Sequence, residues 1–344
     1  MSEIIIDSQS YKHNLNLISS HIGTHTEIAV VLKDNAYGHG LEQISTLARE
    51  YDIKSVFVKN YAEAMRIKDD FPCITALYGM PQGAFPPHIA FVINDKEHIS
   101  ILPKGTNVEL KVNAGMNRNG IQVDEIDEFI KLILHQGLNL MGVFSHNGYG
   151  DDIDDEFEHT QKRFALIKQE VKDLAQKYGF PLPRFHSLSS SGAVREAMKN
   201  KISDDLVRIG IAAYGYLDVA FENPISAKLR KVAALYADRI STRILPQNAR
   251  IGYSGCTKMD SQNKVSTYDI GYGDGFFRVS ERHKVYTAKG YQILPRSSMD
   301  CFSCICDEPR ICVFDDANVI AQAFGTISYE ILTHLSPFIK RTII

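Results

Sequence analysis

Eight short apolar runs, separated by stretches of helical periodicity, most constrain what this chain can fold into. They lie at residues 27–33, 55–60, 73–79, 89–94, 107–113, 140–146, 183–189 and 205–210. Between several runs the apolar residues recur at helical spacing, as in the segment 164–178, which ends at Gly179. Strands that alternate with helices form parallel sheets, and eight of them are typical of a closed barrel. We therefore predict an α/β fold with an N-terminal (β/α)8 TIM-type barrel, in which the close spacing around strands three to five leaves room only for short helices.

The pattern changes after residue 220. The chain becomes rich in β-branched residues and punctuated by glycine, and helical periodicity returns only near "SYEILTHL". This sequence pattern predicts a C-terminal domain of mostly antiparallel β structure. We place the barrel at residues 9–221 and the β domain at residues 222–344, with a junction in "LDVAFENPIS", and we expect residues 1–8 to join the β domain.

Composition excludes several classes of protein. Of the 344 residues, 44% are hydrophobic and 23% are charged, with a formal net charge of −3, so no basic surface for nucleic acid or for a membrane is indicated. No run approaches the roughly 18 apolar residues of a membrane span. The start of the chain, "MSEIIIDSQS", lacks the basic and apolar regions of a signal peptide. We expect a cytoplasmic protein with neither a nucleic-acid nor a membrane partner.

Four of the six cysteines crowd into "CFSCICDEPRIC", residues 301–312. Two thiolates in a C-x-x-C spacing can bind a metal or an iron–sulfur cluster. The simpler interpretation is a pair of strands that use cysteine as a small hydrophobic residue. No histidine or second C-x-x-C accompanies the segment, so we expect no metal site.

Polar residues gather where the predicted barrel strands end, which is where parallel barrels carry their catalytic groups. These ends are Lys33, Asn60, Gly79, Asn94, Asn113, His146, residues 186–190 and residues 208–210. Lys33 at the end of the first strand has three chemical uses: an ion pair, a point charge for phosphate, or a Schiff-base nucleophile. The residue types alone leave these three uses open.

Nine ordered motifs resemble those of the alanine racemases, the fold-type III family of pyridoxal-phosphate enzymes. The first, "VVLKDNAYGHG", is similar to the family's cofactor-lysine motif V-x-K-A-N-A-Y-G-H-G. The others, in order, are "KVNAGMNRNGI", "VFSHNGYGDD", "FHSLSSSGAV", "VRIGIAAYGY", "IGYSG", "IGYGDGFFR", "SSMD" and "ISYEILT". They extend from about residue 30 to residue 333, so the resemblance covers nearly the whole chain.

The resemblance implies an activity and a mechanism. Lys33 matches the lysine that holds pyridoxal 5′-phosphate, and Tyr253 matches a tyrosine on the opposite face of the aldimine. These two bases would remove and return the Cα proton and so interconvert L-alanine and D-alanine, which bacteria use for peptidoglycan. In the family the tyrosine comes from the partner subunit, so a homodimer with shared active sites is implied.

Further roles carry over one residue at a time. Arg208 matches the arginine that faces the pyridine nitrogen, His146 belongs to the same network, and Arg118 matches the residue that engages the substrate carboxylate. Lys111 matches a lysine that is carbamylated in some members. The residues matched to cofactor binding are Tyr37, His186, Ser189, Ser190, Gly210, Ile211 and Tyr329. Met299 and Asp300 match the partner's part of the substrate pocket, and Tyr272, Arg278 and Arg296 resemble the family's access corridor.

Four positions depart from the family pattern, and three alternative functions remain. Ser189 stands where the family has asparagine, Ser191 where it has alanine and Asn113 where it has aspartate. Asp34 follows the lysine in place of alanine. The alternatives are an amino-acid decarboxylase on the same barrel, a racemase for a larger amino acid such as serine or lysine, and a non-catalytic cofactor-binding protein. The decarboxylase is disfavoured by the absence of a G-G-G run, and a racemase for a larger amino acid by Tyr329, which narrows the pocket. The non-catalytic protein is disfavoured by the second domain with Tyr253.

Overall fold

The computed structural model describes residues 1–344, which form two compact units. The barrel unit comprises residues 11–34 and 44–230, and the β unit comprises residues 1–10, 35–43 and 231–344. The β unit therefore includes the start of the chain and the short segment that follows Lys33. The domain boundary between residues 221 and 222 stays a prediction.

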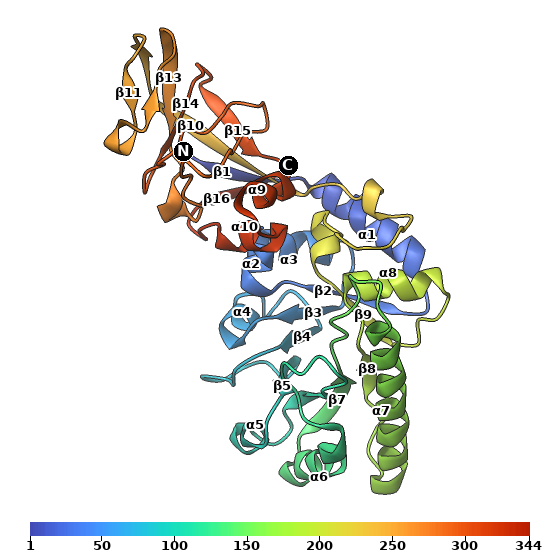
Figure 1. Ribbon diagram of the computed structural model, residues 1–344. Helices are drawn as coiled ribbons and strands as arrows, with labels where there is room; N and C mark the ends of the chain where they lie inside the picture. Colours follow the sequence, from blue (N-terminus) through green and yellow to red (C-terminus); the bar gives the residue numbers. More distant parts are fainter. The chain divides into compact units, whose positions relative to one another are not determined.

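The eight predicted strands form one parallel sheet in the barrel unit (Figure 1). The sheet has the order β8-β7-β6-β5-β4-β3-β2-β9, and Asp205 N and Arg208 N donate across its seam to Phe185 O and Leu188 O at 2.9 and 3.0 Å, which nearly closes the barrel. The strands are β2 (Glu27–Val31), β3 (Ser55–Val58), β4 (Cys73–Ala76), β5 (Ile89–Ile93), β6 (Asn107–Lys111), β7 (Asn139–Phe144), β8 (Arg184–His186) and β9 (Leu206–Ile209). The predicted barrel is confirmed, with strands that end up to three residues earlier than the apolar runs suggest.

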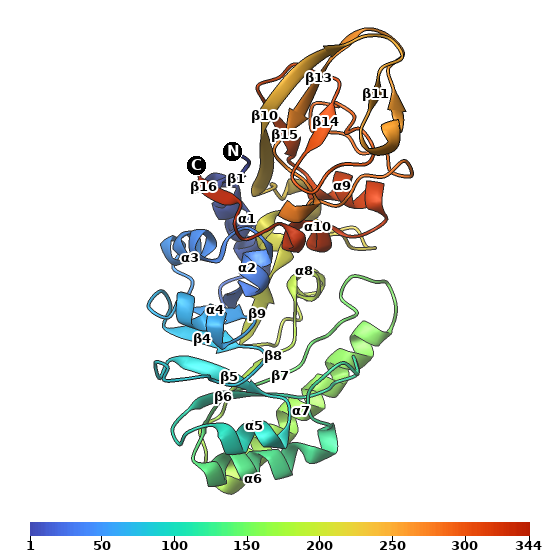
Figure 2. The same cartoon turned by 90° about the vertical axis from the view of Figure 1, so that its left-hand side faces the viewer.

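Helices pack outside this sheet (Figure 2). They are α1 (Ser8–Ile22), α3 (Leu41–Glu50), α4 (Tyr61–Arg66), α5 (Lys96–Ile101), α6 (Ile126–Gln136), α7 (Glu156–Tyr178) and α8 (Ser190–Met198). The predicted stripe of the longest helix is buried at Phe164, Ile167, Val171 and Leu174, and the helix ends at Gly179 with φ 69°. No helix joins β4 to β5, so the alternation of strand and helix fails where the sequence spacing is tightest.

The β unit is built on a six-stranded sheet. Its strands pair antiparallel, except that β1 and β16 run parallel. They are β1 (Glu3–Ile6), β10 (Ala233–Leu245), β13 (Asn263–Tyr268), β14 (Phe302–Cys304), β15 (Arg310–Phe314) and β16 (Lys340–Ile343), and β11 (Arg250–Ile251) pairs β12 (Thr257–Lys258). Helices α9 (Ala317–Phe324) and α10 (Ser328–His334) complete the unit. The prediction of a mostly antiparallel C-terminal domain is confirmed.

The clustered cysteines occupy strands and turns of this sheet. Cys304 and Cys306 are buried, the hydroxyl of Tyr268 lies 2.9 Å from Cys306 Sγ, and none of the six cysteines forms a disulfide. No group of three or more histidine, cysteine or acidic side chains is placed to hold a metal ion. None of the helices is both long enough and apolar enough to span a membrane.

Candidate active site

Nine of the predicted site residues belong to the barrel unit, where they lie at or just beyond the carboxyl ends of strands. They are Lys33, Arg118, His146, His186, Ser189, Ser190, Arg208, Gly210 and Ile211. The others, Tyr37, Tyr253, Tyr272, Arg278, Arg296, Met299, Asp300 and Tyr329, belong to the β unit. The predicted residues thus fall into two groups, one in each unit.

The segment after Lys33 adopts a rare backbone conformation. Asp34, Asn35, Ala36 and Tyr37 all have φ between 52° and 56°, which makes α2 (Lys33–Tyr37) a left-handed turn. Such a turn costs an L-residue roughly 1–2 kcal/mol per position, so it persists only where local contacts enforce it. The segment "KDNAYGHG" therefore encodes a strained turn directly after the lysine.

Hydrogen bonds within the β unit hold this turn. Asn35 Oδ1 accepts from Leu41 N at 2.9 Å, and the buried His39 lies with Nδ1 3.1 Å from both Ala36 O and Tyr37 O. Because carbonyls only accept, Nδ1 carries the proton and donates to them. At Gly38 a Cβ would lie 1.9 Å from Leu332 O, so no other residue fits. The ring of Tyr37 packs 5.9 Å from that of Tyr329, which brings together two residues predicted to bind the phosphate.

Cations dominate the charge around His146 in the barrel unit. Burial, followed by the charges of Arg208, Arg118, Lys111 and Lys33, lowers the pKa of His146 to about 3. Burial and three of the same cations lower the pKa of Lys111 to about 7. His146 is therefore neutral near pH 7, and Lys111 is neutral in a large fraction of molecules. This end of the barrel can accept anionic groups.

Arg208 is held by hydrogen bonds to groups at neighbouring strand ends. Its Nη1 donates to His186 Nδ1, and its Nη2 lies 2.9 Å from Ser145 O and 3.4 Å from both Ser187 O and His146 Nδ1. The side chain is only 6% exposed, and a guanidinium keeps its proton at any ordinary pH. Arg208 thus presents a fixed positive charge that donates and cannot accept.

The loop after β8 is tied to the barrel by Asp204. Its carboxylate accepts from Ser187 N at 2.5 Å and from Ser187 Oγ at 2.9 Å, and it forms a buried ion pair with Lys168 at 2.6 Å. These contacts fix the path of the chain into α8. At the start of that helix, Ser190 Oγ accepts from Gly210 N at 3.1 Å.

The residues that depart from the family pattern have local partners. Ser189 Oγ lies 3.2 Å from Ser191 Oγ, and the Ser189 side chain does not cap α8. Asn113 Oδ1 accepts from Gly115 N and Asn117 N at 3.1 and 3.0 Å, so an amide closes the loop that precedes Arg118. Asp34 pairs with Lys59 at 2.6 Å.

In the β unit several predicted residues lie on exposed loops, whereas Tyr37 is buried and Tyr329 lies on α10. Tyr253 is 58% exposed in a short turn over Tyr253–Gly255, and Met299 is 54% exposed. Gly273 N donates to Met299 O at 2.8 Å, which brings the Tyr272 loop beside the Met299 loop. Arg296 pairs with Glu281 at 2.6 Å, and the pKa of Glu281 is lowered by this contact and by the charge of Arg278.

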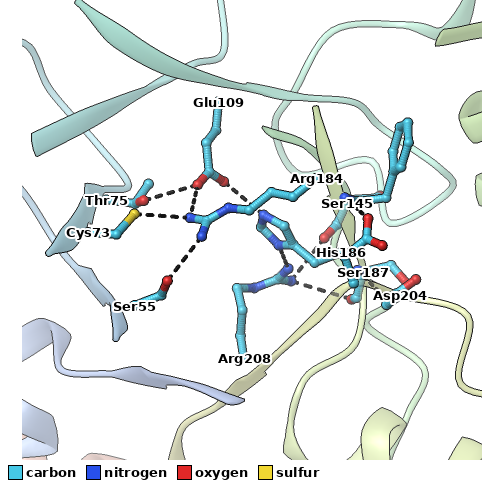
Figure 3. Close-up of polar contacts among 12 residues, drawn as sticks. Ser55, Cys73, Thr75, Glu109, Ser145, Arg184, His186, Ser187, Asp204 and Arg208 are labelled. Carbon is cyan, nitrogen blue, oxygen red and sulfur yellow. Dashed lines mark hydrogen bonds and ion pairs between the residues drawn. The ribbon is translucent and has the colours of Figure 1, made fainter. Parts of the chain in front are cut away.

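Sequence reasoning missed three residues that support the barrel group: Glu109, Arg184 and Asp204. Glu109 and Arg184 are linked by an ion pair in the barrel interior, next to His186 (Figure 3). A signal was available for Glu109, because a charged residue inside a parallel strand buried on both faces requires a partner. Arg184 precedes His186 by two residues, so both side chains point to the same face of β8.

Comparisons with known proteins agree with this architecture. The model of the alanine racemase N-terminal domain matches residues 6–218, and that of the alanine racemase C-terminal domain matches residues 232–343. Alanine racemase from Campylobacter concisus is 37% identical over 344 residues and covers 100% of both chains. Alanine racemase from Nitratiruptor sp. is 37% identical over 346 residues, with 99% of each chain covered.

Solved structures show the same fold. Alanine racemase from Clostridium difficile superposes with a TM-score of 0.84 at 23% identity, covering 100% of this chain and 95% of the other. The Bartonella henselae enzyme, which carries covalently bound pyridoxal phosphate, gives 0.82 at 24% identity, covering 100% and 99%. With both domain models matched in order and relatives aligned along its full length, the chain belongs to the alanine racemase family and acts on an amino acid as a racemase.

Proposed function

We propose that this chain interconverts L-alanine and D-alanine with pyridoxal 5′-phosphate held by Lys33, Lys33 and Tyr253 serving as the two bases. The observation that carries this proposal is the positive charge around His146, which comes from Arg208, Arg118 and Lys33 and, in the molecules where it is protonated, from Lys111. A substrate carboxylate and a cofactor phosphate are both anionic, so a cationic strand end suits both.

The residues present fit the cofactor. The N-terminal N–H groups of α8 are not capped by the Ser189 side chain, and such groups bind phosphate well. Ser190, Gly210 and Ile211 in the barrel unit, and the Tyr37 and Tyr329 hydroxyls in the β unit, are the donors we assign to the phosphate. Arg208 would donate to the pyridine nitrogen, and His186 supports Arg208. When bound, pyridoxal phosphate supplies an electron sink that makes the Cα–H bond of alanine acidic.

The two bases exchange the Cα proton on opposite faces of the substrate. Lys33 Nζ removes or returns it on one face, and the Tyr253 hydroxyl does so on the other. A free phenol titrates near pH ~10, so Tyr253 needs stabilisation of its ionised form. His146 is neutral near pH 7, and with Nδ1 facing Arg208 it carries its proton on Nε2, from which it can donate to a phenolate.

Substrate binding is assigned to Arg118 for the carboxylate and to Met299 and Asp300 for a small side-chain pocket. Tyr272, Arg278 and Arg296 would line the access corridor. The exposure of Tyr253 supports a homodimer in which this tyrosine serves the partner's site. In a bacterial cytoplasm the product would supply D-alanine for peptidoglycan.

The decisive experiment is chiral analysis of L-alanine incubated with the purified protein and pyridoxal phosphate, with L-serine and L-lysine in parallel. We expect D-alanine to form fastest and to approach a near-equal mixture of both isomers. Faster formation of D-serine or D-lysine would show that serine or lysine, and not alanine, is the preferred substrate. If no D-isomer forms while the cofactor is bound, the proposal is wrong.

A further inference from the structure

A continuous chain of polar contacts crosses the interior of the barrel from Arg184 to Arg208 (Figure 3). Glu109 on β6 accepts through Oε1 from Arg184 Nη2 and, at 3.1 Å, from Thr75 Oγ1. Its Oε2 lies 2.8 Å from His186 Nε2, and His186 Nδ1 receives Arg208 Nη1. The side chains of Glu109 and His186 are both fully buried. Glu109 and His186 therefore depend on these neighbours for their hydrogen bonds.

The protonation states of these side chains follow from their contacts. Burial alone would raise the pKa of Glu109, but Arg184 and His186 overcome it and hold the pKa well below its usual range. Burial lowers the pKa of His186 to about 4 despite the opposing pull of Glu109. Near pH 7 Glu109 is thus an ionised carboxylate and His186 is a neutral ring. A carboxylate can only accept, so the ring proton is on Nε2 and Nδ1 is left to accept from Arg208.

Packing prevents the ring from turning over. His186 stacks on Phe144 with ring centroids 4.8 Å apart and 10° between the planes, and Phe57 contacts it edge-on at 5.3 Å. On the adjacent strand β7, Gly142 leaves room for the Glu109 carboxylate, since a Cβ there would lie 3.0 Å from its Cδ. Both ends of the imidazole therefore keep their assigned partners.

We propose that Glu109 is a positioning residue for racemisation: its carboxylate sets the tautomer of His186, and His186 Nδ1 then holds the Arg208 guanidinium in place. Arg184 is the counter-charge that keeps Glu109 ionised. This inference rests on the cofactor-facing role proposed above for Arg208. It assigns a function to two charged residues in the barrel that do not themselves touch substrate or cofactor.

Glu109→Gln tests the proposal. Arg184 and Thr75 both donate toward Oε1, so the amide oxygen will face them and the amide NH2 will face His186 Nε2. The ring must then accept at Nε2 and carry its proton on Nδ1. The Nδ1–H group would point at the N–H group of Arg208, and the hydrogen bond between them would be lost. We expect nitrogen-15 NMR of histidine-labelled holoenzyme to report this proton transfer, and kcat for racemisation to fall roughly 10- to 100-fold.

Arg184→Met is the matched control. It breaks the same ion pair but leaves a carboxyl group facing His186. At alkaline pH that group is ionised even without its counter-charge, so the ring proton should stay on Nε2 and kcat should stay within about two-fold of the wild type. A loss of kcat equal to that of Glu109→Gln would show that the ion pair serves the fold alone. Urea unfolding of each variant measures that contribution separately.

The double variant Glu109→Gln with Arg184→Met covers the case in which the single glutamine variant does not fold. Without Arg184 the amide NH2 can face the Thr75 hydroxyl, which returns the oxygen to His186 and the proton to Nε2. We expect kcat to recover. A proton that stays on Nε2 in Glu109→Gln, or on Nδ1 in the double variant, refutes the role of Glu109. If the proton moves to Nδ1 in Glu109→Gln but kcat is unchanged, the result refutes instead the role of Arg208 in the proposed function.

Discussion

The two groups of predicted site residues differ in how firmly the chain holds them. In the barrel unit His186, Ser190 and Arg208 are no more than 6% exposed, and each has a hydrogen-bond partner on a neighbouring strand end or helix. In the β unit Tyr253 and Met299 are more than half exposed and lie on loops. These barrel residues are fixed by a buried network, whereas Tyr253 and Met299 present their side chains to their surroundings.

This difference separates two kinds of task. A cofactor must be held in one orientation, which requires side chains whose rotamers are locked by their neighbours. A base or pocket residue that serves another subunit must instead project from its own fold, and it becomes fixed only when that subunit covers it. Substitutions of His186, Ser190 or Arg208 should therefore disturb cofactor binding, while substitutions of the exposed loop residues Tyr253 and Met299 should spare it.

Lys33→Ala should have the largest effect. It removes the predicted attachment point and one of the two bases, so racemisation should fall by about 10³-fold or more, and the visible absorption of cofactor joined to the protein should disappear. The matched control is Lys59→Ala, which removes the exposed lysine that pairs with Asp34. Retention of the visible band in Lys33→Ala would exclude Lys33 as the attachment point.

Tyr253→Phe should reduce racemisation by about 10²-fold or more while the cofactor stays bound, because only the proton-transferring hydroxyl is lost. Tyr286→Phe removes the hydroxyl of another exposed tyrosine of the β unit and serves as the control. Absorption spectra and rates in both directions of the reaction are the measurements. Full rate in both directions would refute the two-base scheme.

Mixing the two inactive variants tests whether the β group serves the partner. In a heterodimer with shared sites, one site carries both substitutions and the other carries none. Random reassociation of Lys33→Ala with Tyr253→Phe should then restore about a quarter of the wild-type rate. If each site draws Lys33 and Tyr253 from the same chain, mixing will restore nothing.

The same contrast explains what could be predicted from sequence. The barrel follows from apolar runs and helical stripes, and Lys33, His146 and Arg208 stand out as polar residues at strand ends. Glu109 could have been noticed as a charged residue in a buried parallel strand, but its pairing with Arg184 joins β6 to β8, and no local sequence pattern reveals such a contact. The residues of the β group carry no physical signal of their own, since an exposed tyrosine on a loop is unremarkable, and only the family resemblance pointed to Tyr253 and Met299.

Lys111 should react with carbon dioxide. Burial and the neighbouring cations lower its pKa to about 7, so near pH 8 its amine is mostly neutral and nucleophilic. A carbamate would also place a negative charge beside Arg118. Carbon-13 NMR of protein equilibrated with labelled bicarbonate should show a carbamate signal that is absent in Lys111→Arg, whose racemisation rate should change several-fold at most. A signal that persists in the variant would assign the carbamate to another amine.

The smallest effect concerns the pH dependence of stability in the two units. Burial lowers the pKa of His39 in the β unit, and that of His186 in the barrel unit, from 6.5 to about 4. Both folded-state rings resist protonation, so the unfolded chain binds more protons as the pH falls. Their contribution to stability is complete above pH 6.5 and is lost between pH 6.5 and about 4. Each ring should contribute a slope of about 1.4 kcal/mol per pH unit to the free energy of unfolding.

His39→Asn isolates the β unit's part of this slope. The asparagine amide can still donate to Ala36 O and Tyr37 O, so the left-handed turn should survive while the titratable ring is gone. We expect urea unfolding between pH 7.5 and 5 to show a flatter dependence in His39→Asn than in the wild type. His159→Asn, at a half-exposed helix position, should keep the wild-type slope. If His39→Asn also keeps the wild-type slope, His39 does not contribute to the pH dependence of stability, and that dependence arises from groups in the barrel unit.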